Sequence, residues 1–180
     1  MAELVSETYA NALFETALEN NLQDTVKAEI NSLYDILLEN SDYTKILSSP
    51  IVGLKEKHEL ANAAFNGKIC DYLLNLIFVL IDNDRFAIFF DVVIAYNKFY
   101  DRQNNILRVT AVTAIELSND MKDKLQAKFC LLSNKTVVMS NEVDATLLGG
   151  ILLHYDNMEI DATVKSKLDG IKKQVRAKTL

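Results

Sequence analysis

The chain contains few of the residues that interrupt helices: its 180 residues include five glycines, one proline and no tryptophan. Because proline and glycine are the poorest helix formers, this scarcity predicts a protein built mainly of long helices. The length allows one or two domains with substantial cores. The 49% apolar content is ordinary for a globular protein.

Cysteine and histidine occur only twice each, and neither is arranged as a set of ligands. Cys70 and Cys130 lie far apart, and His58 and His154 have no Cys, Asp or Glu at ligand spacing. We therefore expect free, buried thiols in a reducing compartment and histidines with a structural role. No metal site is expected.

Motifs for catalysis and cofactor binding are also missing. Asp82 and Asp84 begin like a calcium loop, but Ala87 and Val93 stand where that loop requires Gly and Glu. The sequence has no phosphate loop, dinucleotide fingerprint or nucleophile elbow. We therefore expect neither an enzyme nor a bound cofactor.

Long apolar runs are absent as well. The longest, Leu73–Ile81, is interrupted by Asn75 and is far shorter than the ~20 residues that span a bilayer. The first residues lack the basic and apolar regions of a secretory signal. We expect a chain that does not cross a membrane by itself.

Apolar periodicity divides the chain near residue 105. Stripes at helical spacing predict five or six helices, packed as an all-α bundle, over residues 4–20, about 22–40, 43–47, 54–65, 69–81 and 85–102. Beyond Asn105 the pattern predicts a small α/β domain, with strands at 106–115, 136–139 and 150–155, a helix at 119–132 capped by Ser118, and a basic helix at about 163–178. The predicted fold is mainly α, with domains 1–105 and 106–180.

The segment from Gly149-Gly150 to Leu168 is typical of a structural turn. The glycine pair permits a positive φ or a close backbone approach, and Ile151–Leu153 form a short strand that stops at Asp156-Asn157. Asp161 or Thr163 can then cap the terminal helix. Nothing in this pattern holds a nucleophile, a metal or a phosphate.

Charge changes sign between the two parts. Residues 1–105 carry 8 Lys/Arg against 16 Asp/Glu, whereas residues 106–180 carry 11 against 9. Six positive residues lie between Lys165 and Lys178. This basic helix could dock on its own sheet or contact an acidic helix of another protein. If it instead binds nucleic acid, the alternative function is that of a helical RNA-binding or ribosome-associated protein.

Two of the predicted helices have apolar residues beyond one stripe. Leu74, Phe78 and Ile81 form a second stripe on helix 69–81, and Val5, Tyr9 and Ala12 lie off the main seam of the first helix. If the two helices are neighbours, these residues line a groove for an amphipathic helix. The alternative is that helix 69–81 is simply buried on all sides.

Five segments together form a family pattern: Tyr9–Phe14 (Tyr-Ala-x-Ala-Leu-Phe), Leu47–Pro50 followed by Lys55 and Lys57, Asn83–Arg85, Val109–Ser118, and Gly149-Gly150 with Asp156 and Ile160–Val164. On these segments the chain resembles the delta subunit family of bacterial rotary ATP synthase, the counterpart of the mitochondrial oligomycin-sensitivity-conferring protein. The last segment is the most specific. It departs from the family in Ala162 for the usual Gly and Thr163 for the usual Ser, and Lys165 and Lys167 stand where Arg is common.

The resemblance implies a non-catalytic stator subunit that holds the catalytic head still against rotor torque. It implies an N-terminal six-helix bundle whose groove, between the first and fifth helices, binds the N-terminal helix of an alpha subunit. It also implies a C-terminal domain that binds the C-terminal region of the b subunit. Candidate stalk contacts are Lys165, Lys172, Lys173 and Arg176. The expected location is the cytoplasmic face of the cell membrane, with no nucleic acid bound and membrane association only through the complex.

Overall fold

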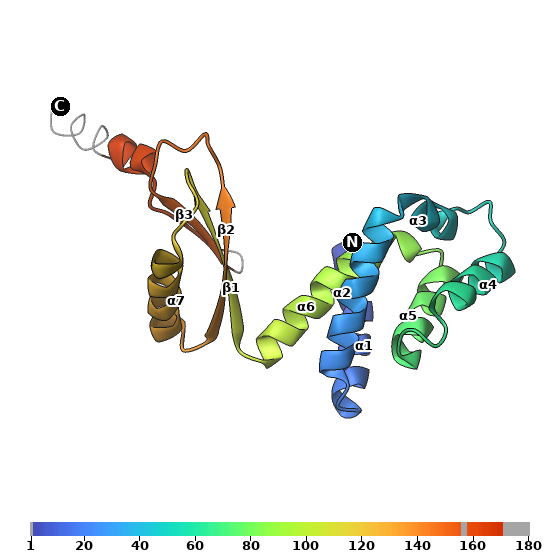
Figure 1. Cartoon of the computed structure of the whole chain (residues 1–180). Coiled ribbons are helices and arrows are strands. Elements are labelled where there is room, and N and C mark those ends of the chain that lie inside the picture. The colour runs from blue at the N-terminus through green and yellow to red at the C-terminus, as the bar shows by residue number, and fades with distance from the viewer. Residues whose placement is uncertain (1, 156–157, 171–180) are drawn as a thin grey trace. The chain divides into compact units, whose positions relative to one another are not determined.

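The computed structural model describes residues 2–155 and 158–170, which form two compact units (Figure 1). The first unit, residues 1–101, is helical and is called the helical unit below. The second, residues 102–180, contains a small sheet and is called the sheet unit. The sequence pattern placed this division at residue 105.

The helical unit consists of helices joined by short turns. Their bounds are α1 (Ala2–Glu19), α2 (Gln23–Glu39), α3 (Ser41–Ser48), α4 (Leu54–Phe65), α5 (Asp71–Asp82), the 3-10 turn η1 (Phe86–Ile88) and α6 (Phe89–Gln103), whose last two residues are counted with the second unit. Each predicted helical segment is helical, although the segment at 85–102 is split between η1 and α6.

After several of the described helices the left-handed turn residue is asparagine or aspartate, whereas glycine takes this place after α4, at Gly67 with φ of 72°. Asn21, Asp84, Asn105 and Asn134 all have φ between 50° and 56°, the left-handed conformation. Asn and Asp adopt it more readily than other residues with a side chain, because their short polar groups bond to the local backbone. A chain with few glycines and a single proline can thus still turn sharply.

The core of the helical unit is apolar and aromatic. Val26, Ile30, Leu33 and Leu37 of α2 are buried, as their helical spacing predicted. Phe14 of α1 meets Tyr96 of α6 edge to face, with ring centroids 5.7 Å apart. The Tyr96 hydroxyl donates a hydrogen bond to the Gln23 carbonyl oxygen at 3.2 Å, and burial raises the pKa of this phenol.

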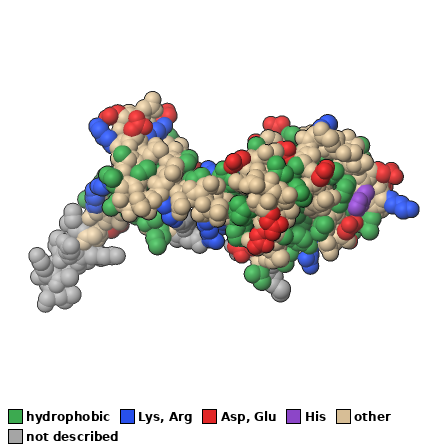
Figure 2. All heavy atoms as spheres, turned by 90° about the horizontal axis from the view of Figure 1, so that it is seen from below, with side chains coloured by type: hydrophobic (Ala, Val, Ile, Leu, Met, Phe, Trp, Pro, Cys, Tyr) green, Lys and Arg blue, Asp and Glu red, His purple; other side chains and the backbone are tan. Residues whose placement is uncertain are grey.

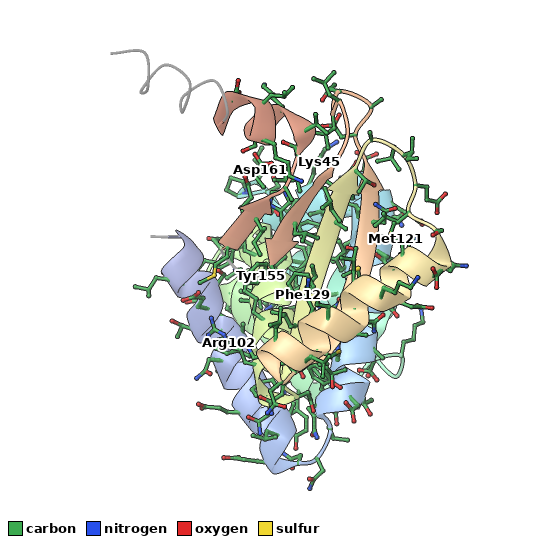
Figure 3. All side chains as sticks on the ribbon, turned by 90° about the vertical axis from the view of Figure 1, so that its left-hand side faces the viewer. Lys45, Arg102, Met121, Phe129, Tyr155 and Asp161 are labelled. Carbon is green, nitrogen blue, oxygen red and sulfur yellow. The ribbon has the colours of Figure 1, made fainter. Side chains whose placement is uncertain are left out.

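The sheet unit is a mixed four-stranded sheet with a helix on one face. Its strands, in the order β2-β1-β3-β4, are β1 (Ile106–Thr113), β2 (Thr136–Val143), β3 (Ile151–Tyr155) and β4 (Met158–Asp161). β1 and β2 are parallel, whereas β3 is antiparallel to both β1 and β4. Helix α7 (Asn119–Ser133) packs on one face, where Phe129 lies beside Tyr155 at 5.8 Å between centroids (Figure 3).

The structure confirms the Ser118 cap and corrects two strand predictions. The Ser118 hydroxyl oxygen accepts a hydrogen bond from the Met121 N–H. β2 continues past Met139 to Val143, because it pairs with β1 as far as Thr113; Nδ2 of the polar Asn141 also donates to the Ala111 carbonyl oxygen at 2.8 Å. β4 was not predicted, since a strand of four residues between turn signals has no readable period.

Two further predictions concern the terminal helix and membrane spans. Residues 164–170 are helical, the start of the predicted basic helix, whereas its remainder and the turn residues Asp156 and Asn157 lie outside the described residues. Among the described helices, none has both the length and the apolar character of a membrane span.

Candidate protein-binding surfaces

A shallow groove of about 230 Å³ runs between α1 and α5 of the helical unit. Each helix contributes four residues spaced i, i+3, i+4 and i+7, so that one face of each lines it. The lining residues are Tyr9, Ala12, Leu13 and Thr16 from α1, and Tyr72, Asn75, Leu76 and Val79 from α5. Figure 2 shows one face of the molecule, with hydrophobic side chains exposed among acidic ones on the helical unit.

The chemistry of the groove suits an apolar helix face. Leu13 and Leu76 are buried and form its floor, whereas Ala12 and Val79 are exposed and leave room above it. The Thr16 hydroxyl donates its hydrogen bond to the Ala12 carbonyl oxygen at 2.8 Å, within its own helix. A partner helix would therefore meet mostly carbon, with Asn75 as an exposed polar group.

The predicted residues of α1 fall in or next to this groove. Tyr9 and Ala12 line it, and Val5 is half-buried one turn earlier, on the same face of α1. The Tyr9 hydroxyl accepts a hydrogen bond from Nη1 of Arg85 at 3.3 Å. This contact ties the wall of the groove to the turn after α5.

The predicted stripe of α5 faces elsewhere. Leu74 is 8% exposed and Ile81 is 0% exposed, so both belong to the core, and Phe78 stacks on His58 of α4 with ring centroids 4.8 Å apart. None of these three residues lines the groove described here, and their part in binding a partner stays a prediction. The physical reason is that α5 packs against both α1 and α4 and buries six residues, which leaves less free surface than a helix with a single neighbour.

The groove residues that the sequence did not single out are Leu13, Thr16, Tyr72, Asn75, Leu76 and Val79. A signal for them was present. The spacing of the four α1 residues is repeated on α5 by Tyr72, Asn75, Leu76 and Val79. The polar Asn75 interrupts this second set, so that it is not a purely apolar stripe. A groove between helices is bordered by half-exposed positions, and a search for purely apolar stripes passes over those.

Three side-chain contacts hold the turn after α5 against its neighbours. The buried Lys57 of α4 places Nζ 3.3 Å from Oδ1 of Asp84, and Nε2 of His58 lies 2.7 Å from Oδ1 of Asp82. With Arg85 and Tyr9, the turn thus contacts both α1 and α4. Three of the family-type segments of the sequence meet here, and they fix the end of the groove.

A second apolar cavity, of about 390 Å³, lies elsewhere on the helical unit. It is bordered by α2, α3 and the end of α4. Its lining includes the apolar or aromatic residues Ile36, Tyr43 and Phe65 and the charged residues Glu29 and Lys68. Tyr43 donates a hydrogen bond to the Leu60 carbonyl oxygen at 2.9 Å, and burial raises the pKa of its phenol. No pattern in the sequence predicted this cavity.

The glycine pair of the sheet unit packs against the start of the terminal helix. Gly149 and Gly150 have φ of 140° and 88°, and the Val164 N–H donates to the Gly149 carbonyl oxygen at 3.0 Å. A Cβ added at Gly150 would lie 2.6 Å from the Ala162 oxygen. The pair thus combines positive φ values with a close backbone approach, the two roles that the sequence allowed.

The two candidate caps of the terminal helix have separate partners. The Thr163 hydroxyl oxygen accepts a hydrogen bond from the Ser166 N–H at 3.2 Å and so caps the helix. Asp161 accepts the Thr163 N–H at 2.8 Å, and this bond holds the pKa of the Asp161 carboxyl below its usual range. The candidate stalk residue Lys165 is exposed, whereas Lys172, Lys173 and Arg176 lie outside the described residues.

A helical unit with an apolar surface groove, followed by a small α/β unit without a described metal cluster, is typical of the class of protein-binding subunits. Comparison with known proteins gives this class a family. The family model "ATP synthase delta (OSCP) subunit" matches residues 5–175. ATP synthase subunit delta of Clostridioides difficile is 34% identical over 97% of both chains, and that of Alkaliphilus metalliredigens is also 34% identical over 97% of both.

The chain belongs to the family of ATP synthase delta (OSCP) subunits. Subunits of this family are structural and coupling parts of the peripheral stalk and are not catalytic. The fold agrees: a chain in the cryo-EM structure of the Toxoplasma gondii mitochondrial ATP synthase hexamer superimposes with a TM-score of 0.76, at 21% identity and with 94% of this chain and 96% of that chain covered. The alternative of an RNA-binding or ribosome-associated protein finds no support in these comparisons.

Proposed function

We propose that the groove between α1 and α5 binds the N-terminal helix of an ATP synthase alpha subunit. The helical unit then acts as the six-helix bundle of the family and sits on the catalytic head. The observation that carries this proposal is the pair of matched four-residue stripes around a floor of Leu13 and Leu76. Such a surface fits an amphipathic helix laid along it.

The sheet unit is proposed to bind the C-terminal region of the b subunit, with Lys165, Lys172, Lys173 and Arg176 as candidate contacts. The chain would then join the head to the stalk at the cytoplasmic face of the membrane, as a peripheral subunit of the complex. In support, this unit exposes large apolar side chains that a protein partner would cover, among them Ile115, Leu131, Leu132 and Leu148.

The groove is tested by placing a charge in it. Val79 is 43% exposed and borders the groove, so Val79→Asp should leave the fold intact and set a carboxylate against the apolar face of the partner helix. We expect the affinity of the full chain for a peptide of the alpha-subunit N-terminal helix to fall at least about tenfold, as measured by titration calorimetry.

Ile94→Asp on α6 is the matched control, because Ile94 is 49% exposed and does not line the groove. This variant should bind the peptide as the unaltered chain does. Equal binding by the Val79 and Ile94 variants would place the peptide elsewhere, and failure of the peptide to bind the folded, unaltered chain would remove the proposal.

A further inference from the structure

β2 forms one edge of the sheet, and it is the longer of the two edges (Figure 1). The Thr136 N–H donates to the Asn105 carbonyl oxygen at 2.9 Å, and the Asp144 N–H donates to the Thr113 carbonyl oxygen at 2.9 Å. In a parallel pair, alternate residues direct both backbone groups to the neighbour. The backbone N–H and C=O groups of the even-numbered residues of β2 therefore point toward β1, and those of the odd-numbered residues point away from it.

Among the described residues, a partner for this outer edge is found only at its start. Nε2 of Gln126, from α7, donates to the Val137 carbonyl oxygen at 2.7 Å. The outward N–H and C=O groups of Met139, Asn141 and Val143 have no backbone or side-chain partner within residues 2–155 and 158–170. Three consecutive outward positions are thus available.

Proteins usually protect such an edge with lysine, proline, a bulge or a short length. The opposite edge, β4, follows this rule, since it has four residues and two of them are acidic. β2 has eight residues with a single charged one, Glu142, contains neither lysine nor proline, and pairs with β1 without a break in register. An edge left in this state is suited to pairing with another strand.

We propose that β2 accepts a fifth strand from an extended segment of the stalk partner. This inference rests on the proposed function, in which the sheet unit binds the C-terminal region of the b subunit. A helix could not satisfy the outward groups of β2, because its own backbone groups are bonded internally. An extended segment can bond all three positions by strand addition.

The two faces beside the edge define the sequence that this segment needs. Met139 and Val143 lie on the face covered by α7, together with the core residue Val137, whereas Ser140 and Glu142 lie on the opposite face. The added strand should therefore alternate apolar residues toward the α7 face with polar residues on the other. It should have no proline where its N–H pairs with β2.

Residue-resolved hydrogen exchange of the full chain provides the test, with the soluble C-terminal half of the b subunit as the probe. At a probe concentration ten times Kd, about one tenth of the chain is free. Exchange at the Met139, Asn141 and Val143 amides should then slow about tenfold. The amides of Val138, Ser140 and Glu142 already face β1 and should change much less, so that the protection has a period of two.

Val143→Pro tests the same edge by mutation. It removes an outward N–H and no bond to β1, and the Val143 side chain is 57% exposed, so the fold should be kept. We expect it to weaken probe binding at least about fivefold, whereas the control Val143→Ala, which keeps the N–H, should bind within about twofold of the unaltered chain.

The other possible outcomes contradict strand addition, the stalk function or the proposed occupant of the edge. Binding of the probe without the period-two protection would overturn strand addition and leave the stalk function standing. Absence of any binding by the folded chain would overturn both. The same protection on raising the concentration of the chain alone would assign the edge to a second copy and overturn the stalk segment as its occupant.

Discussion

Replacement of Gly150 by alanine is expected to destabilise the sheet unit by about 2–5 kcal/mol. The φ of 88° alone costs a residue with a side chain roughly 1–2 kcal/mol. The new Cβ would also lie 2.6 Å from the Ala162 oxygen and 2.7 Å from Cα of Thr163, both backbone atoms that cannot rotate away. Relief of such a clash costs another ~1–3 kcal/mol.

The measurement is thermal unfolding of the full chain, with hydrogen exchange to assign the transition to the sheet unit. For a unit of this size, the expected loss lowers Tm by about 10 °C or more. The control is Gly149→Ala, whose φ of 140° is also unfavourable but whose Cβ would meet only Cγ2 of Val164, at 3.5 Å. It should cost clearly less. Equal losses at the two positions would show that conformation, not close approach, explains the pair.

The helices could be predicted because their signals are local. Helical spacing of Val26, Ile30, Leu33 and Leu37 marks α2, and the Asn and Asp residues at the turns mark where helices end. The Ser118 cap is equally local. β4 depends on pairing with β3 and has four residues, so its formation is decided by tertiary contacts that no short window of sequence contains.

The candidate groove was predictable only in part, for a related reason. Tyr9 and Ala12 could be selected because they lie off the main seam of α1. The sequence could not show that Leu74 and Ile81 are core residues and not groove residues. Which side of α5 is buried depends on where α4 packs against it. Periodicity shows how many faces of a helix are apolar, but not which neighbour each face meets.

Loss of the Asp84 side chain is the other change with a large expected effect, in the helical unit. Lys57 is 1% exposed and its Nζ lies 3.3 Å from Asp84, which is itself 69% exposed. Removal of one partner of a buried pair typically costs ~3–5 kcal/mol, because a buried charge is left uncompensated. Since Asp84 is close to solvent, we expect Asp84→Gly to cost about 2–3 kcal/mol, measured by urea unfolding.

Glycine is the appropriate replacement, because Asp84 has φ of 52° and glycine adopts that conformation without strain. Asp82→Asn, at the last residue of α5, is the control: its pair with His58 is partly exposed, at 34% and 54%, and should contribute less than ~1 kcal/mol. Adding Lys57→Met to Asp84→Gly removes the uncompensated charge and should recover most of the loss. If the double variant were no more stable than Asp84→Gly, the loss would reflect the turn itself and not the buried ammonium. Recovery of stability in the double variant would show that the turn after α5 compensates the buried ammonium of Lys57. The same turn contacts the wall of the proposed helix-binding groove, through Arg85 and Tyr9.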